Sequence, residues 1–191
     1  DLTSAYASFV NGGKKINPIL IDRIQDRRGK NIYLADFGNC LNCSEPFIED
    51  NPLPVIKDGN VQIFDPINSY QMVSILKGAV DRGTGRRTKI TGIEIGGKTG
   101  TTNKNTDAWF IGFTSDLIVG VYAGFDNPRT LGKRETGSSV AVPIFKDFLT
   151  NYYSGKKALP FKIPRGVELI QVNVDTGEVG FDVDDDKTIY E

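Results

Sequence analysis

The sequence contains no histidine, and among its 191 residues it has only two cysteines, one methionine and one tryptophan. Without histidine the chain cannot form a Ser-His-Asp or Cys-His catalytic group, and a histidine-ligated metal site is excluded as well. Any acid–base chemistry must therefore rest on lysine, carboxylates, tyrosine or cysteine. We expect neither a metal nor a cofactor.

Charge and hydrophobicity exclude two further classes. The chain has 23 basic and 24 acidic residues, so its net charge of −1 gives no basic surface for nucleic acid. No apolar run approaches the ~18 residues that a membrane-spanning helix needs. The composition, 39% hydrophobic and 10% aromatic, is sufficient for a folded core. The length fits one domain or a part of a larger one.

The first segment, residues 2–10, predicts a helix, because Leu2, Tyr6, Phe9 and Val10 fall on one helical face. The Asn-Gly-Gly sequence that follows is typical of a helix end. Because the chain begins inside an apolar helical pattern, we expect it to be a piece of a longer protein.

Residues 14–65 have the composition of a loop-rich insertion. Within it, apolar residues 19–21 and 31–34 flank a polar turn at 26–30 and predict a β-hairpin. Cys40 and Cys43 are two thiols without histidine, too few for a zinc site. A loop disulfide and a pair of free thiols both remain open, whereas redox catalysis is disfavoured.

The remaining sequence is more regular. Asp65-Pro66 predicts the start of a helix that ends at a glycine-rich turn, residues 81–85. Residues 108–113 and 117–125 are apolar and separated by three polar residues, which predicts an antiparallel hairpin. Apolar residues spaced by four then predict a helix over about 138–153. They are Val140, Ile144, Phe148 and Tyr152.

These patterns indicate an α+β fold. We expect an antiparallel sheet centred on the strand that contains Lys98, covered by the helices that begin at Asp65 and Ser138. Residues 156–191 are expected to form a C-terminal extension, with a small hairpin over 167–179.

The segment around Lys98 has two incompatible interpretations. Residues 92–99 match the phosphate-binding pattern G-x-x-x-x-G-K-T. That pattern binds phosphate only where a buried strand precedes it and a helix begins at the Lys-Thr pair. Polar residues 86–89 precede it and a glycine follows, so the sequence disfavours nucleotide binding.

The second interpretation places Lys98-Thr99-Gly100 on an edge strand of a serine acyl-transfer site. Lysine supplies positive charge, threonine hydroxyls bind a substrate carboxylate, and glycine allows close approach to the backbone. A backbone N–H on the same strand can serve in an oxyanion hole. A surface turn without a role is the alternative.

Two other groups are weaker candidates. Ser74 and Lys77 have the S-x-x-K spacing of a nucleophile and its lysine, but they lie in a helix whose neighbours look structural. We interpret Ser74 as part of an ordinary packed helix. The acidic run of residues 184–186 is expected to be a solvated tail and not a metal site.

Seven segments together resemble class A penicillin-binding proteins, the bifunctional peptidoglycan synthases of the 1A type, in the family's own order. They are residues 2–13, 82–85, 96–103, 107–113, 124–128, 131–132 and 172–177. The sequence Lys-Thr-Gly-Thr-Thr-Asn of 98–103, followed by Asp-Ala-Trp-Phe, is the most specific part.

The resemblance implies a β-lactamase/transpeptidase-like fold, with residues 1–155 as the C-terminal portion of the transpeptidase domain. It implies a serine-type DD-transpeptidase or D-Ala-D-Ala carboxypeptidase. Lys98 would then supply positive potential and support proton transfer, and Thr99 and Thr101 would bind the substrate or drug carboxylate. The Thr101 N–H would form half of the oxyanion hole. Gly100 would leave room for substrate, and Thr102 would be a further substrate-binding residue.

The family's serine motif S-x-x-K and its S-x-N lie upstream of the first helix and are not in this chain, so we expect the chain alone not to acylate. The resemblance places the parent protein, with a glycosyltransferase domain and a membrane anchor, at the periplasmic face of the inner membrane, this chain being a soluble portion. That location favours a Cys40–Cys43 disulfide.

Expected partners are peptidoglycan stem peptides, β-lactams and the rest of the transpeptidase domain, but not nucleic acid. The main alternative is a non-catalytic cell-wall binding or scaffold module. A phosphate-loop nucleotide binder ranks third.

Overall fold

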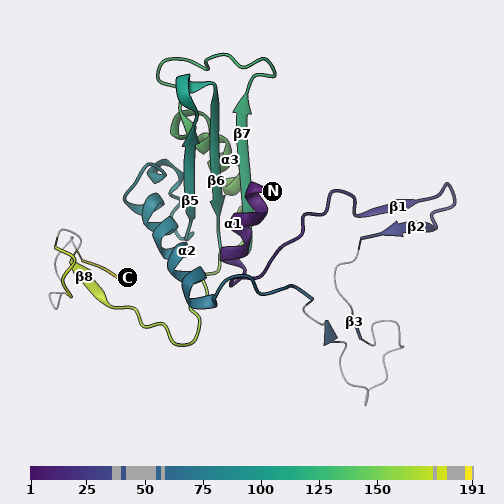
Figure 1. The fold of residues 1–191 in the computed structure, drawn as a ribbon, viewed down its shortest axis with the longest axis horizontal. Helices are drawn as coiled ribbons and strands as arrows, with labels where there is room; N and C mark the ends of the chain where they lie inside the picture. Colours follow the sequence, from purple (N-terminus) through teal and green to yellow (C-terminus); the bar gives the residue numbers. More distant parts are fainter. Residues whose placement is uncertain (36–39, 42–54, 57–58, 174–175, 180–187, 191) are drawn as a thin grey trace.

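A computed structural model of the protein describes residues 1–35, 40–41, 55–56, 59–173, 176–179 and 188–190 (Figure 1). The described part contains helices α1 (Leu2–Val10), α2 (Pro66–Asp81) and α3 (Val142–Tyr152). The largest sheet is antiparallel, in the order β5 (Gly96–Thr101), β6 (Asp107–Phe113) and β7 (Ile118–Gly124). This arrangement confirms the α+β class.

Shorter elements complete the described part. Three two-stranded sheets pair β1 (Arg23–Gln25) with β2 (Asn31–Leu34), β3 (Cys40–Leu41) with β4 (Val55–Ile56), and β8 (Gln171–Asn173) with β9 (Thr188–Tyr190). Single helical turns are η1 (Arg86–Thr88), η2 (Asn103–Asn105) and the π-helical η3 (Gly137–Ala141). None of the helices in the described part is long and apolar enough to cross a bilayer.

The three-stranded sheet is covered on both faces because its central strand β6 is apolar on both sides. Phe110 packs on Phe145 of α3, with ring centroids 4.9 Å apart. The next residue of β6, Ile111, lies opposite Gly120 of β7. A side chain added at Gly120 would collide with Thr3 of α1. Since neighbouring residues of a strand face opposite ways, α3 and α1 cover opposite faces of the sheet.

The strand of Lys98 lies at the edge of the sheet, which confirms the edge strand of the acyl-transfer interpretation, whereas the expectation of a sheet centred on this strand was wrong. After β5 the chain turns through η2 and returns as β6, which pairs with β5 on one side and β7 on the other. Among the described residues no strand pairs with the other side of β5. An edge position is nevertheless what a substrate-binding strand requires.

Helix α2 begins as the sequence predicts. The Asp65 carboxylate accepts hydrogen bonds from the N–H groups of Ile67, at 2.8 Å, and Asn68, at 3.2 Å. These bonds satisfy two backbone donors that the first turn of a helix leaves unpaired. Val73, Leu76 and Val80 form its buried face together with Ser69.

Helix α3 forms where expected but buries a different face. The predicted residues Ile144 and Phe148 are 51% and 47% exposed, whereas Val142, Phe145 and Leu149 are fully buried. A strict spacing of four turns about 40° around the helix at each step, since one residue covers about 100°. The buried residues alternate spacings of three and four, which keeps them on one side.

The β1–β2 hairpin forms, but its first strand begins at Arg23 and not within residues 19–21. The turn decides this register. The Asp26 carboxylate accepts the N–H groups of Arg28 and Lys30 at 2.8 and 2.9 Å, and Gly29 has a φ of 81°. The turn therefore closes at residues 26–30, and the strand must end immediately before it. The hairpin projects away from the main sheet (Figure 1).

The C-terminal hairpin is only partly as predicted. Across the expected turn the structure has one bridge, between Val172 and Val179, while the ladder of β8 is made with Thr188–Tyr190. Residues 184–186 lie outside the described residues. Phe161 packs on Phe113, with ring centroids 5.7 Å apart, so the chain after α3 returns to the body. The division of the chain at residue 155 stays a prediction.

Candidate functional site

The side chains of β5 alternate between the two faces of the sheet. Lys98 and Gly100 share one face, and Thr99 and Thr101 share the other. Lys98 is exposed, and its Nζ donates to the carbonyl oxygen of Thr99 at 2.9 Å. The lysine charge therefore lies at the outer edge of the sheet, beside the two threonines.

The backbone of β5 presents donors and acceptors at the same edge. The N–H of Thr102 donates to Asp107 at 3.3 Å, toward β6. In an antiparallel pair, inward-pointing backbone groups recur at every second residue. Lys98 and Gly100 therefore bond toward β6, and Thr99 and Thr101 direct their N–H and C=O groups outward. The Thr101 N–H thus has the orientation predicted for an oxyanion donor.

The hydroxyl of Thr101 is oriented by the start of η3. The N–H of Gly137 donates to Thr101 Oγ1 at 3.0 Å. Because a hydroxyl carries one proton and can accept as well as donate, this bond leaves the Thr101 proton for another acceptor. Thr101 is exposed, so a carboxylate can reach it.

The hydroxyl of Thr99 has a partner that the sequence analysis did not assign. Thr99 Oγ1 lies 2.9 Å from Thr84 Oγ1, in the turn that follows α2. The carbonyl of Thr84 in turn accepts the hydroxyl of Ser138 at 3.2 Å. Three segments far apart in the sequence therefore meet at the edge strand. The sequence signal that could have pointed to Thr84 is its position in residues 82–85, one of the segments that carry the family resemblance.

Glycines on the two elements, η3 and β5, lie where a side chain would have little room. A side chain at Gly137 would collide with the backbone oxygen of Gly100, so only glycine lets η3 lie directly on β5. A Cβ at Gly100 would lie 3.2 Å from the Trp109 Cβ, on the other face. The sequence predicts a role of Gly100 toward substrate. It gives no signal for Gly137, because the role of Gly137 depends on its tertiary contact with β5.

Thr102 closes the turn after β5. Its Oγ1 accepts the N–H of Asp107 at 2.9 Å and lies 2.9 Å from Thr106 Oγ1. A substrate contact of Thr102 therefore stays a prediction.

The phosphate-loop interpretation of residues 92–99 is wrong. It requires a helix that begins at the Lys-Thr pair, because phosphate binds to backbone N–H groups at a helix start. Lys98 and Thr99 lie within strand β5, and their neighbours Gly97 and Gly100 are paired with β6.

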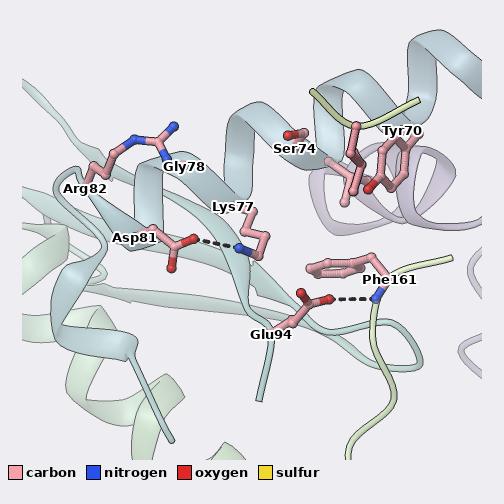
Figure 2. A pocket seen from close by; sticks show the side chains of 10 residues that line it. Tyr70, Ser74, Lys77, Gly78, Asp81, Arg82, Glu94 and Phe161 are labelled. Atoms are coloured by element: carbon pink, nitrogen blue, oxygen red, sulfur yellow. Dashed lines mark hydrogen bonds and ion pairs between the residues drawn. The ribbon is translucent and has the colours of Figure 1, made fainter. Parts of the chain in front are cut away.

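Ser74 and Lys77 line a pocket of about 240 Å³ on α2, together with Tyr70 and Glu94 (Figure 2). The Lys77 ammonium is paired with Asp81 at 2.8 Å. Across the pocket, Glu94 accepts the N–H of Phe161 at 2.8 Å. The lysine one turn after Ser74 is thus held in an ion pair, which supports the structural interpretation of Ser74.

Burial in this pocket raises the pKa of Tyr70, and the nearby Glu94 carboxylate raises that pKa further. Both effects keep the phenol in its neutral form at physiological pH. Tyr70 is therefore a neutral side chain that lines this pocket.

The cysteine prediction lies largely outside the described residues. Cys43 is not among them, and Cys40 is described only as the first residue of strand β3. In the part of the chain that the structure describes, no three carboxylates or thiols are placed to hold a metal ion.

Comparison with known proteins supports the resemblance to penicillin-binding proteins. The family model "Penicillin binding protein transpeptidase domain" matches residues 1–150. Penicillin-binding protein 1A of Rickettsia conorii is 47% identical over 180 residues, which cover 93% of this chain and 23% of that protein. The chain thus spans less than a quarter of that relative's length.

Solved structures agree on the fold. The crystal structure of penicillin-binding protein 1A from Haemophilus influenzae superposes with a TM-score of 0.72 at 28% identity, covering 99% of this chain and 31% of that one. Penicillin-binding protein A from Mycobacterium tuberculosis, in an imipenem acyl-enzyme complex, shares the fold alone. Its TM-score is 0.52 at 20% identity, covering 77% of this chain and 29% of that one. The chain belongs to the penicillin-binding protein transpeptidase family, and it carries part of the transpeptidase domain of a class A protein of the 1A type.

Proposed function

We propose that the protein containing this chain is a peptidoglycan DD-transpeptidase and that this chain supplies the substrate-binding wall of its active site. The observation that carries the proposal is the outer edge of β5. That edge presents the Lys98 ammonium, the Thr101 hydroxyl and the outward Thr101 N–H. Together these groups can bind a carboxylate and stabilise an oxyanion.

The reaction proceeds through an acyl-enzyme. A serine contributed by another part of the domain attacks the carbonyl of the penultimate D-Ala, and the peptide bond to the terminal D-Ala breaks. D-Ala leaves as the amine after it takes a proton. An amine of a neighbouring stem peptide then attacks the ester, forming the cross-link and returning the serine. Where water replaces that amine, the same site acts as a carboxypeptidase.

Residues of this chain act at three points of that reaction. Thr99 and Thr101 hold the carboxylate of the terminal D-Ala through hydroxyl donors. The Thr101 N–H donates to the oxygen that becomes negative in the tetrahedral intermediate. Lys98 supplies positive potential to both anionic groups and supports proton transfer. Gly100 leaves the strand open to the substrate backbone.

β-Lactams are the expected inhibitors because they present a reactive amide and a carboxylate in the same relation. The stem peptides and the rest of the transpeptidase domain complete the set of partners. We place the parent protein at the periplasmic face of the bacterial inner membrane.

The test is acylation of the longer protein by a fluorescent penicillin. Lys98→Ala should lower the acylation rate by about two orders of magnitude, the loss expected for a preorganised electrostatic group. Lys104→Ala is the matched control, since Lys104 is an exposed lysine just beyond β5. Wild-type acylation by the Lys98 variant would contradict the proposal.

A second arm uses the 191-residue chain by itself. It should remain unlabelled, because the proposal takes its nucleophile from elsewhere. Stoichiometric labelling would place the nucleophile here, with Ser74 as the first serine to replace. Absence of any adduct in the longer protein would favour a non-catalytic cell-wall binding module.

A further inference from the structure

Two loops meet at the end of the sheet where the candidate site lies. One is the turn η2 between β5 and β6. The other is the β7–η3 loop, which we define as residues 125–136. The N–H of Leu131 donates to the carbonyl of Asn105 at 2.8 Å, and the Asn105 Nδ2 donates to the carbonyl of Gly132 at 3.0 Å. A single residue of the turn therefore holds the loop by its backbone and its side chain.

The backbone of η2 has an unusual conformation at this point. Lys104 and Asn105 have φ values of 64° and 53°, and they are the non-glycine residues with positive φ in the described part of the chain. This left-handed region is unfavourable for most side chains, and asparagine tolerates it best after glycine. Such a conformation persists where surrounding contacts hold it. The contacts here include the two bonds to the loop and a bond from the Asn105 N–H to the carbonyl of Thr102 at 3.1 Å.

The loop that Asn105 holds leads directly to the group that orients Thr101. Within the loop, the N–H of Glu135 donates to the carbonyl of Gly132 at 3.2 Å. Five residues after Gly132, the N–H of Gly137 reaches Thr101 Oγ1. Thr101 and Asn105 are joined by the turn, so the contacts form a closed ring around the end of β5. Loosening the ring at Asn105 removes one anchor of the segment that positions Gly137, while the bond from Ser138 to Thr84 remains.

We propose that Asn105 is a positioning residue for the carboxylate-binding hydroxyl of Thr101. It anchors the β7–η3 loop, which keeps the Gly137 N–H on Thr101 Oγ1 and so directs the Thr101 proton toward the substrate carboxylate. The inference rests on the proposed function and deepens it, because it assigns to the loop the recognition of a substrate carboxylate. It predicts an effect that depends on that carboxylate.

The test uses three variants of the longer protein. Asn105→Gly keeps a residue that accepts the left-handed backbone but removes the Nδ2 donor. Asn105→Asp keeps the size and turn preference but places an acceptor against the Gly132 carbonyl. Lys104→Gly is the control, since it relaxes the neighbouring left-handed residue without removing either bond to the loop.

The first readout compares the acylation rates of a penicillin and of the methyl ester of its carboxylate. Both Asn105 variants should lower the rate with the acid by about tenfold, the loss expected when one hydrogen bond to a charged group is weakened. The rate with the ester should stay within about twofold of wild type, and Lys104→Gly should leave the ratio of the two rates unchanged. An equal loss with acid and ester would overturn the proposal.

The second readout does not depend on catalysis. Hydrogen–deuterium exchange over residues 131–138 should rise in both Asn105 variants and stay at the wild-type level in Lys104→Gly. Unchanged exchange there would overturn the proposal, and so would increased exchange throughout β6 and α3, which would make Asn105 a general stability residue. If the wild-type protein forms no penicillin adduct, the proposed function fails, while the exchange data still decide whether Asn105 anchors the loop.

Discussion

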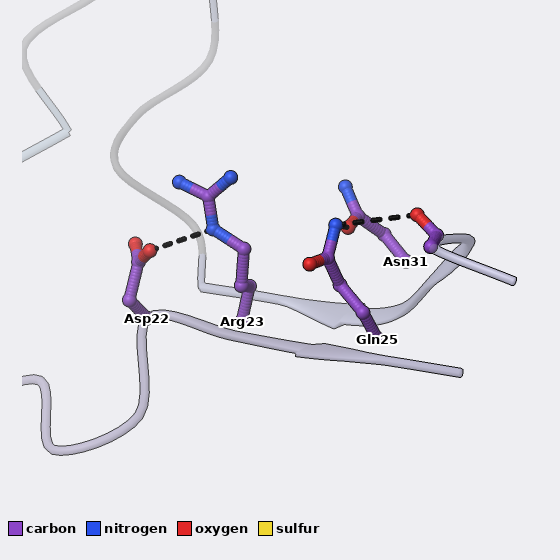
Figure 3. Close-up of polar contacts among 5 residues, drawn as sticks. Asp22, Arg23, Gln25 and Asn31 are labelled. Carbon is purple, nitrogen blue, oxygen red and sulfur yellow. Dashed lines mark hydrogen bonds and ion pairs between the residues drawn. The ribbon is translucent and has the colours of Figure 1, made fainter. Parts of the chain in front are cut away.

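The β5–β6–β7 sheet and the β1–β2 hairpin are both antiparallel, but they are stabilised in different ways. In the sheet, Phe110 and Phe113 are fully buried between helices. In the hairpin, every strand residue is exposed. Polar contacts hold the hairpin instead, including one from Gln25 Nε2 to Asn31 Oδ1 at 2.9 Å and an ion pair of Arg23 with its neighbour Asp22 (Figure 3).

The difference shows what each kind of contact contributes. Burial of apolar side chains supplies most of the free energy of folding, whereas an exposed polar pair contributes on the order of 1 kcal/mol or less. An isolated two-stranded hairpin is marginally stable in water. We therefore expect changes in the sheet to alter the whole fold and changes in the hairpin to remain local.

The largest expected effect comes from the contact between α3 and the sheet. Phe145→Ala should lower the free energy of unfolding by about 3–5 kcal/mol, because it leaves a cavity against Phe110. Phe148→Ala, on the exposed face of the same helix, is the matched control and should cost less than about 1 kcal/mol. Urea unfolding of the two variants measures the difference. Equal losses would mean that the exposed face of α3 is packed in solution.

The next effect is a pH dependence at the other end of the sheet. Tyr153 donates a hydrogen bond to Asp116 and lies 2.8 Å from Thr114 Oγ1. The bond from Tyr153 is the main cause that lowers the pKa of Asp116 below its ordinary value. Because the folded-state pKa is lowered, the stability it contributes is present above the ordinary pKa and is lost as the pH falls through the folded-state value.

Unfolding measured from pH 7 down to pH 3 checks this assignment. Asp116→Asn should show a weaker loss of stability with falling pH than wild type. Tyr153→Phe should restore the Asp116 pKa toward its ordinary value and weaken the dependence in the same direction. An unchanged pH profile in both variants would exclude this carboxylate as a source of the dependence.

Loss of the hairpin turn should have a smaller and local effect. Asp26→Ala removes the acceptor for two backbone N–H groups, so hydrogen exchange should rise across residues 23–34. The midpoint of thermal unfolding should move by no more than a few degrees, about 1 kcal/mol or less. Asp22→Ala, which removes the exposed pair with Arg23, is the control. A large shift in the midpoint would show that the hairpin belongs to the core.

The smallest expected effect concerns Cys40 and Cys43. If they form a disulfide, it closes a short loop, and the entropy gained from constraining the unfolded chain is correspondingly small. Replacement of both by serine should change the free energy of unfolding by about 1 kcal/mol or less. Mass measurement after thiol labelling counts the free thiols in the wild type. A fold that collapses in the double variant would contradict a peripheral role.

Local chemistry made several elements predictable from the sequence. The start of α2 depends on one carboxylate and one proline, Asp65 and Pro66, and the structure has both in place. The β6–β7 hairpin follows from two apolar runs separated by three residues. By contrast, the buried face of α3 was mispredicted, because Ile144 and Phe145 are equally apolar and only the sheet selects between them.

The sequence by itself determined the strand that carries Lys98, Thr99, Gly100 and Thr101, because the Lys-Thr-Gly motif is typical of a strand beside a serine acyl-transfer site. The contact of Thr101 with Gly137 was decided by the tertiary structure. These two residues are 36 positions apart in the sequence, and the fold brings them together where η3 lies on β5. A hydrogen bond of that kind has no local sequence signal, because its donor is a backbone N–H that any residue except proline possesses.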